Sequence, residues 1–285
     1  METLRGIREV FHARPTREGA GVLLHRAFGY SQVPRLDPFL MLDDFRGDRP
    51  DDYLAGFPWH PHRGIETVTY MLDGEVDHGD SMGNAGVIGP GDVQWMTAGS
   101  GIIHQEMPRP VDGKMGGFQL WVNLPASAKM MNPRYQEVKA STIPVVRLSP
   151  DVHVRVIAGT AGEITGPVQG IVAEPLYLDI TVSPGARFIY PVSGDHTVIV
   201  YVFSGSGLFS SGVTQYGNRT ALLFDDGDEI SAVAGDAGLR FLMIAGKPIK
   251  EPVAWGGPIV MNTEGELQQA FEEYRAGTFI KKDGK

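Results

Sequence analysis

The chain has 285 residues, of which 42% are hydrophobic, so it is long enough for one large or two ordinary domains with real cores. It contains no cysteine, which excludes disulfides, thiolate metal ligands and cysteine nucleophiles, and which fits a reducing compartment. A formal net charge of −9 argues against direct nucleic-acid binding, which needs a basic surface.

The N-terminal residues lack the apolar stretch of a signal peptide, and the longest apolar runs, such as Val198–Phe203, have the length of a strand. We therefore expect a cytoplasmic protein without a membrane span. The many glycines and prolines (Gly 37, Pro 20) favour short strands joined by tight turns.

The first motif along the chain is the dyad His60-Pro-His62. On a β-strand this spacing puts both imidazoles on one face. Pro61 is tolerated in a strand only at an edge or a bulge, because it has no N–H to donate. Alone, such a dyad is a weak signal, with two surface or core histidines as the alternative. We expect the neighbouring Arg63 to form a structural ion pair.

Three further segments predict strands. Glu66–Leu72 is rich in β-branched and aromatic residues and stops at the turn signal Asp73-Gly74. Val87–Trp95 contains Pro90-Gly91-Asp92, a turn that leads into another strand, and Phe118–Leu124 partly alternates apolar and polar residues. Short strands at this spacing favour a sandwich or a barrel.

A second dyad, His104-Gln-Glu106, has the same spacing as the first. If the two strands are antiparallel neighbours, the dyads lie about 4.5–5.5 Å apart at Cβ. Three imidazole nitrogens and one carboxylate oxygen could then bind one divalent metal. His60, His62, His104 and Glu106 are therefore the candidate metal ligands. The other histidines are expected to be surface or core residues: His12, His25, His78, His153 and His196.

The second half of the chain repeats the first half weakly but in order. Tyr70–Gly74 resembles Tyr201–Gly205 at an offset of 131, and Gly91-Asp92 matches Gly227-Asp228 at an offset of 136. These offsets carry the four candidate ligands onto residues that cannot form the same site: Pro191, Ser193, Arg240 and Leu242. We predict a duplicated barrel in which only the first copy binds metal.

The boundary between the copies is expected near Ala140–Pro150, where prolines interrupt the strands. This gives a metal-binding domain over residues 1–140 and a domain without ligands over residues 141–285. The one convincing helix is Thr263–Ala276, which Asn262 or Thr263 can cap and which Gly277 ends. Its apolar side chains fall on one face, as expected for a helix that packs against a barrel.

The residues around the dyads also resemble those of a known family. The run HPHRGIETVTYMLDG from His60 and the run GPGDVQWMTAGSGIIHQEMP from Gly89 look like the signature of the pirin family within the cupin superfamily. The closing segment FLMIAGKPIKEPVAWGGPIVMNTEGELQQAFEEYRAGTF is similar too. The resemblance covers nearly the whole chain and implies an all-β fold of two tandem cupin β-barrels, a bicupin, with a C-terminal helix.

Carried over by position, the pirin ligands fall on His60, His62, His104 and Glu106. In the general cupin motif Glu66 would be a ligand. Pirins share this departure, so we interpret Glu66 as a residue that supports the site or the fold without binding the metal.

The resemblance implies one metal per chain, usually iron. Nitrogen and oxygen ligands suit Fe(II), Mn, Ni and Cu. A closed structural zinc site is the alternative, although structural zinc usually has cysteine ligands. We expect an open site that binds O₂ or a chelating oxygen substrate.

The resemblance also implies an enzyme of the quercetin 2,3-dioxygenase type that acts on flavonols. Glu106 would accept the proton of the substrate hydroxyl, and O₂ would open the heterocycle with release of carbon monoxide. Six side chains near the dyads could line a pocket for a flat aromatic or fill the barrel core: Phe57, Trp59, Trp95, Met96, Met107 and Trp121.

Pirins are also known as regulatory proteins that bind partner proteins, with the metal as a redox-sensitive structural element. This is the alternative function. A deep cavity above the metal would favour the enzyme, whereas a shallow site beside a charged surface patch would favour partner binding.

Overall fold

The computed structural model describes residues 3–109 and 111–281. Contacts divide the chain into two compact units. Unit 1 runs up to Ala13 and continues over Ser141–Pro248, and unit 2 comprises Arg14–Ala140 and continues from Ile249. Relative to the expected domains 1–140 and 141–285, the two terminal segments are exchanged. A single cut after residue 140 would separate each of them from the strands and loops with which it pairs.

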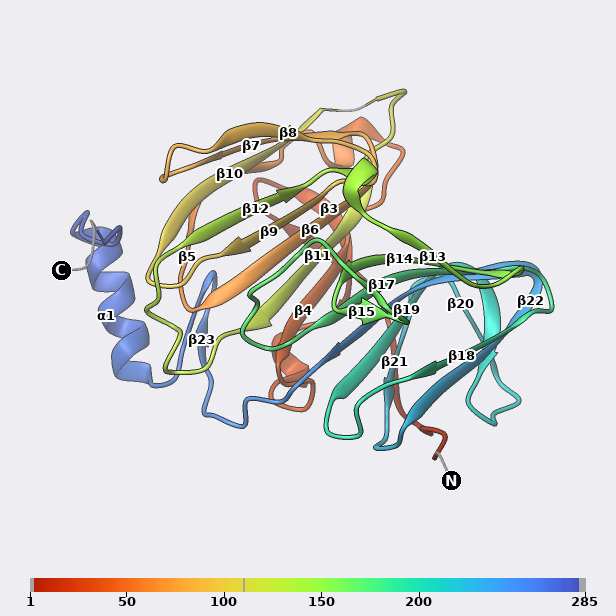
Figure 1. Cartoon of the computed structure of the whole chain (residues 1–285). Coiled ribbons are helices and arrows are strands. Elements are labelled where there is room, and N and C mark those ends of the chain that lie inside the picture. The colour runs from red at the N-terminus through yellow and green to blue at the C-terminus, as the bar shows by residue number, and fades with distance from the viewer. Residues whose placement is uncertain (1–2, 110, 282–285) are drawn as a thin grey trace. The chain divides into compact units, whose positions relative to one another are not determined.

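Unit 2 contains a seven-stranded sheet of order β12-β9-β6-β11-β4-β3-β2 and a four-stranded sheet of order β5-β10-β7-β8. Figure 1 shows β5, β10 and β7 facing the strands β12, β9, β6 and β11. The strands of the larger sheet are β2 (Arg14–Glu18), β3 (Val22–Phe28), β4 (Phe39–Asp44), β6 (Ile65–Asp73), β9 (Val93–Thr97), β11 (Gly116–Asn123) and β12 (Arg134–Val138). Those of the smaller sheet are β5 (Phe57–His62), β7 (Glu75–Asp80), β8 (Ala85–Ile88) and β10 (Ile102–Arg109).

The segments expected to be strands fall on these elements. Glu66–Leu72 lies within β6, and Phe118–Leu124 overlaps β11. Val87–Trp95 is broken by its predicted turn into the end of β8 and the start of β9. Gly74 has a φ of 72°, a backbone conformation that favours glycine, and it ends β6 where the turn was predicted.

Unit 1 is built on a nine-stranded sheet with the path β1-β21-β19-β22-β17-β14-β13, to which β18 and β20 add through β22 and β19. Its N-terminal strand β1 (Ile7–His12) pairs with β21, which explains why the first residues belong to this unit. The other strands are β13 (Val145–Ser149), β14 (Val152–Ala158), β15 (Thr160–Ala161), β16 (Ile164–Thr165), β17 (Leu176–Val182), β18 (Arg187–Pro191), β19 (Thr197–Phe209), β20 (Gln215–Gly217), β21 (Thr220–Phe224) and β22 (Glu229–Gly246).

The interior of unit 1 is apolar. Valine, leucine, isoleucine and phenylalanine side chains from its strands form one buried cluster, which includes Val200, Phe209 and Phe241. β13 lies between Pro144 and Pro150 at the edge of the sheet, where a proline costs no hydrogen bond of a central strand.

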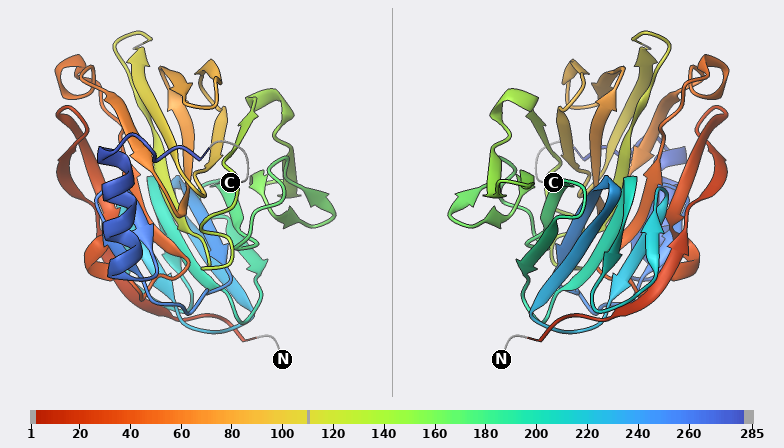
Figure 2. Two further views of the ribbon diagram at one scale, coloured as in Figure 1. Left: turned by 90° about the vertical axis from the view of Figure 1, so that its left-hand side faces the viewer. Right: turned by 90° about the vertical axis from the view of Figure 1, so that its right-hand side faces the viewer.

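The chain from Ile249 adds a hairpin of β23 (Ala254–Gly256) and β24 (Ile259–Met261) and the helix α1 (Glu264–Arg275) to unit 2. The helix was predicted within one residue at each end. Thr263 caps it, and its hydroxyl and the carboxylate of Glu266 form the reciprocal bonds of a capping box. Leu267 and Ala270 are buried against this hairpin, and the helix lies in front of the strands of unit 2 in the left view of Figure 2.

Buried cations attach this C-terminal segment to the barrel of unit 2. Arg63 pairs with Glu273 at 2.7 Å and donates to the carbonyls of Ser100 and Phe279, which confirms the expected ion pair. Lys129 donates to the carbonyls of Gly64 and Val260. A Cβ at Gly64 would meet the Val260 oxygen at 1.9 Å, so only glycine permits this close approach.

The described part of the chain is thus all-β with one C-terminal α-helix, as predicted. No helix among the described residues is long and apolar enough to cross a membrane.

Candidate metal centre

The two dyads lie on neighbouring antiparallel strands, as the site requires. His104 on β10 is directly opposite His60 on β5, and Ile102 is opposite His62. β5 is an edge strand of its sheet, which is where Pro61 was expected. Directly opposite residues of a sheet point to the same face, so the three imidazoles meet on one side of the smaller sheet.

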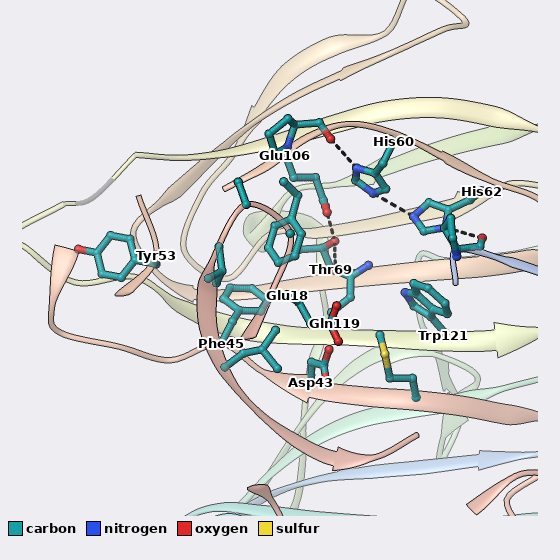
Figure 3. Close-up of a pocket in the computed structure, with 18 of the residues that line it drawn as sticks. Glu18, Asp43, Phe45, Tyr53, His60, His62, Thr69, Glu106, Gln119 and Trp121 are labelled. Atoms are coloured by element: carbon teal, nitrogen blue, oxygen red, sulfur yellow. Dashed lines mark hydrogen bonds between the residues drawn. The ribbon is translucent and has the colours of Figure 1, made fainter. Parts of the chain in front are cut away.

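The ring nitrogens of these imidazoles form one compact group. One nitrogen from each of His60, His62 and His104 lies within 4.8 Å of the other two. Among the described residues, these three histidines form the one group of histidine and carboxylate side chains whose ligand atoms lie close enough together to hold a metal ion. Figure 3 shows the first two of them side by side at the pocket.

Two backbone carbonyls fix the tautomers of His60 and His62. The Nδ1–H of His60 donates to the Pro58 oxygen at 2.8 Å, and the Nδ1–H of His62 donates to the Pro258 oxygen at 3.0 Å. Because a carbonyl only accepts, each neutral ring has its lone pair on Nε2. The two Nε2 atoms face each other at 3.1 Å. Two acceptors cannot bond to each other, so a cation between them is the arrangement that satisfies both.

His104 completes the group with unpartnered nitrogens. Among the described residues, neither its Nδ1 nor its Nε2 has a hydrogen-bond partner, although both are buried. Burial, followed by the neighbouring imidazoles, lowers the pKa of His62 to about 3 and holds the pKa of His104 well below the usual histidine value. Both rings are therefore neutral near pH 7, the form that binds metal. The donor set fits a borderline divalent metal, which would satisfy the orphaned lone pairs.

Glu106 lines the same cavity but is not within the compact group of the three imidazoles. An irregularity between His104 and Glu106 in the pairing of β10 with β5 sets Glu106 opposite Phe57. The Thr69 hydroxyl donates to Glu106 Oε1 at 2.9 Å. The same hydroxyl is 2.7 Å from Gln119 Oε1, which is a second acceptor for its hydrogen. The Thr69 hydroxyl therefore lies between one oxygen of Glu106 and the amide of Gln119, as Figure 3 shows.

Glu66 does not face this cavity. It lies three residues before Thr69 on β6, so the alternation of a strand sends the two side chains to opposite faces. Its Oε1 accepts from the Thr97 hydroxyl at 2.7 Å, and burial raises its pKa. Glu66 is a buried residue of the other sheet face, in agreement with the interpretation that it is not a ligand.

The imidazoles of His60 and His62 lie in the wall of a cavity of about 730 Å³ in unit 2. Of the six side chains considered for a pocket, Phe57, Trp59 and Trp121 line it. Trp95 and Met96 are fully buried core residues, and Met107 does not line the cavity.

Several lining residues lie outside the dyads and were not singled out: Glu18, Arg26, Asp43, Thr69, Gln119, Trp255 and Pro258. They come from β2, β3, β4, β6, β11 and the C-terminal segment. A strand pattern identifies which face a residue is on, but it does not say which strands face a common cavity.

His78 is buried next to the site. Its Nε2–H donates to Asp80 at 3.3 Å, its Nδ1 accepts from Gln94 at 2.9 Å, and its ring is 5.6 Å from that of His104. It is thus a core histidine with polar partners, as expected for the histidines outside the dyads.

Family comparisons agree with this geometry. A model of the Pirin family matches residues 21–122, and a model of the Pirin C-terminal cupin domain matches residues 177–280. A pirin-like protein of Caulobacter vibrioides is 45% identical over 97% of this chain and 99% of its own length. The chain belongs to the pirin family.

Solved structures place this pirin among bicupins. A quercetin 2,3-dioxygenase of Acinetobacter baumannii superposes with a TM-score of 0.89 at 33% identity and covers 97% of this chain and 98% of its own. A bacterial pirin of Escherichia coli in complex with nickel(II) shares the fold with a TM-score of 0.65 at 20% identity, over 84% of this chain and 99% of its own. The predicted fold of two cupin domains is confirmed.

This pirin is expected to bind one equivalent of metal per chain. The repeat counterparts of the candidate ligands are Pro191, Ser193, Arg240 and Leu242; in unit 1 Arg240 pairs with Asp179, and Leu242 is buried. Elemental analysis should give one equivalent for the wild type and none for the double variant His60→Ala, His62→Ala. Two equivalents in the wild type would contradict a single site.

Proposed function

We propose that this pirin is a metal-dependent dioxygenase of flavonols, of the quercetin 2,3-dioxygenase type, with one Fe(II) bound by His60, His62, His104 and Glu106. Mn, Ni, Cu or Zn also suit these donors. The observation that carries the proposal is the opposed pair of Nε2 atoms at 3.1 Å in the wall of a 730 Å³ cavity. The similarity to the quercetin 2,3-dioxygenase of Acinetobacter baumannii supports it.

When bound, the metal would supply a Lewis acid for a substrate oxygen and an electron for O₂. The chain supplies the proton acceptor. Thr69 holds Oε1 of Glu106, so the second oxygen of this carboxylate can take the proton of an incoming hydroxyl. The backbone carbonyls of Pro58 and Pro258 keep the two imidazole lone pairs pointed at one place.

The cavity supports an enzyme over the alternative of a purely regulatory protein that acts through a partner. Its volume is in the range of sites for drug-sized ligands, and aromatic side chains such as Trp121 and Phe57 line it. They would exclude water around a flat substrate. A cytoplasmic location, which the lack of cysteine favours, is part of the same proposal.

The decisive experiment is O₂ uptake with quercetin by protein purified without oxygen and loaded with one metal at a time. We expect turnover with carbon monoxide as a product for at least one of iron, manganese, nickel or copper. Absence of O₂ uptake with all four would reject the enzyme and favour the regulatory role.

The variant Thr69→Val should weaken metal binding about 10–100-fold, the usual effect of losing a residue that orients a ligand. The change keeps the shape of the side chain and removes the hydroxyl that donates to Glu106. Competition with a chelator would measure the affinity. Thr67→Val, a buried threonine on the same strand, is the matched control. Equal affinities for both variants would show that Thr69 does not position Glu106.

A further inference from the structure

A row of polar side chains crosses the inner face of the larger sheet of unit 2. Thr69 on β6 is directly opposite Gln119 on β11, which is directly opposite Asp43 on β4, which is opposite Arg26 on β3. All four line the cavity. Thr69 and Asp43 are buried, and Gln119 and Arg26 are partly buried. Polar residues in registered positions on four successive strands are not needed to close a barrel, whose interior is ordinarily apolar.

This polar row begins at the metal centre and leads away from it. Thr69 binds Glu106, and Asp43 lies two strands further on, about 10 Å across the sheet at the usual strand spacing. Figure 3 shows Glu106, Thr69, Gln119 and Asp43 in this sequence along the pocket. A molecule that reaches the metal centre with one end can therefore reach Asp43 with the other.

The far end of the row carries excess negative charge. Arg26 donates to both oxygens of Asp43 at 2.8 Å, and its third nitrogen pairs with Glu18 at 2.9 Å. Arg26 is the one lysine or arginine among the described residues that line the cavity, whereas Glu18, Asp43 and Glu106 are carboxylates. Each bound oxygen of Asp43 keeps a second lone pair, which can accept a hydroxyl hydrogen but not another anion.

An aromatic wall runs beside the polar row. Trp121 follows Gln119 by two residues on β11, so both side chains are on the inner face. The Trp121 ring is 5.1 Å from that of His62 and 5.9 Å from that of Trp255, which is 5.5 Å from the ring of the exposed Tyr30. A flat ring system stacked on this wall presents its edge to the polar row.

We infer that the polar row selects the substrate: Asp43, together with Glu18, accepts hydrogen bonds from hydroxyl groups at the end of the substrate remote from the metal centre. The pocket then takes uncharged, polyhydroxylated flat aromatic molecules and rejects carboxylates of the same size. This inference rests on the proposed function, because it states which substrates the proposed dioxygenase site would accept and which it would reject. Arg26 acts as a positioning residue that holds both carboxylates.

The test compares two flavonols that differ in the hydroxyls of the pendant ring: quercetin, which has two, and galangin, which has none. Their dissociation constants are measured without oxygen on the iron-loaded protein through quenching of tryptophan fluorescence. The wild type should bind quercetin about tenfold or more tighter, as one hydrogen bond to a charged group would give. In the double variant Arg26→Met, Asp43→Leu, this ratio should fall to about one.

The double variant removes both charges together, so it leaves no orphaned buried ion. Glu18→Gln, at a partly exposed residue, provides a milder change that should lower the ratio without a risk to folding. Asp77→Asn, which breaks the exposed pair with Arg109 outside the cavity, is the matched control and should keep the wild-type ratio. A variant that only disturbs the structure of the pocket would weaken the binding of quercetin and of galangin equally.

The outcomes separate this inference from the oxygenase itself. Equal affinities in the wild type, or an unchanged ratio in the double variant, would overturn the selection by Asp43 even if O₂ is consumed. Selective binding of quercetin without O₂ uptake would support the selection and reject the oxygenase. Failure of both flavonols to bind would overturn both.

Discussion

Glu106→Gln, reloaded to full metal occupancy, is expected to turn over quercetin about 10²–10⁴-fold more slowly than the wild type, the usual cost of losing a general base. The amide oxygen can still accept from Thr69, so the side chain should keep its place. It cannot take a proton near neutral pH. The measurement is turnover per bound metal at saturating quercetin and O₂.

His104→Gln serves as the comparison for this variant, because we expect it to act through lost metal. Its turnover should return in proportion to the metal that it retains. Wild-type turnover in fully metallated Glu106→Gln would remove Glu106 from proton transfer and leave it, at most, a role in binding.

Metal should stabilise unit 2 against unfolding by about 4 kcal/mol when the free metal is a thousandfold above its dissociation constant. The gain arises because the folded unit gathers three imidazoles that the unfolded chain does not hold together. All four tryptophans, Trp59, Trp95, Trp121 and Trp255, belong to unit 2. Denaturant unfolding followed by tryptophan fluorescence therefore reports on this unit selectively.

The double variant His60→Ala, His62→Ala should show the same fluorescence transition with and without metal. Among the described residues, the strands of unit 1 carry no group of metal ligands. Metal should therefore change the stability of unit 1 against unfolding only as far as the unfolding of unit 1 is coupled to that of unit 2. A metal-dependent shift of the fluorescence transition in the double variant would contradict the assignment of these histidines.

Local patterns were enough to identify the ligand candidates and the helix. The i, i+2 spacing of each dyad sets both side chains on one strand face whatever the rest of the fold does. The α1 boundaries follow from a capping box and an ending glycine, which are contacts within a few residues. The weak repeat between the two halves predicted the duplicated barrel from local turn residues. Gly74 and Gly205 both have a positive φ, Gly74 directly after β6 and Gly205 at an irregularity within β19.

Other features depend on pairings between distant residues. His62 donates to Pro258, which is 196 positions away, and β1 pairs with β21 across a similar span, so the terminal segments exchange units. No periodicity within either segment specifies such a partner, because side-chain alternation fixes a face and leaves the register and the neighbour open.

Local sequence patterns therefore predict the two dyads of candidate metal ligands, in the first of two β-barrels, and the helix in the C-terminal segment. Only the tertiary structure decided what surrounds them. In the folded chain, Glu66 faces away from the cavity and Thr69 contacts Glu106. Gln119, Asp43 and Arg26 lie opposite one another on neighbouring strands. The physical reason is that ligand spacing is a property of one strand, whereas a cavity is made by the packing of many.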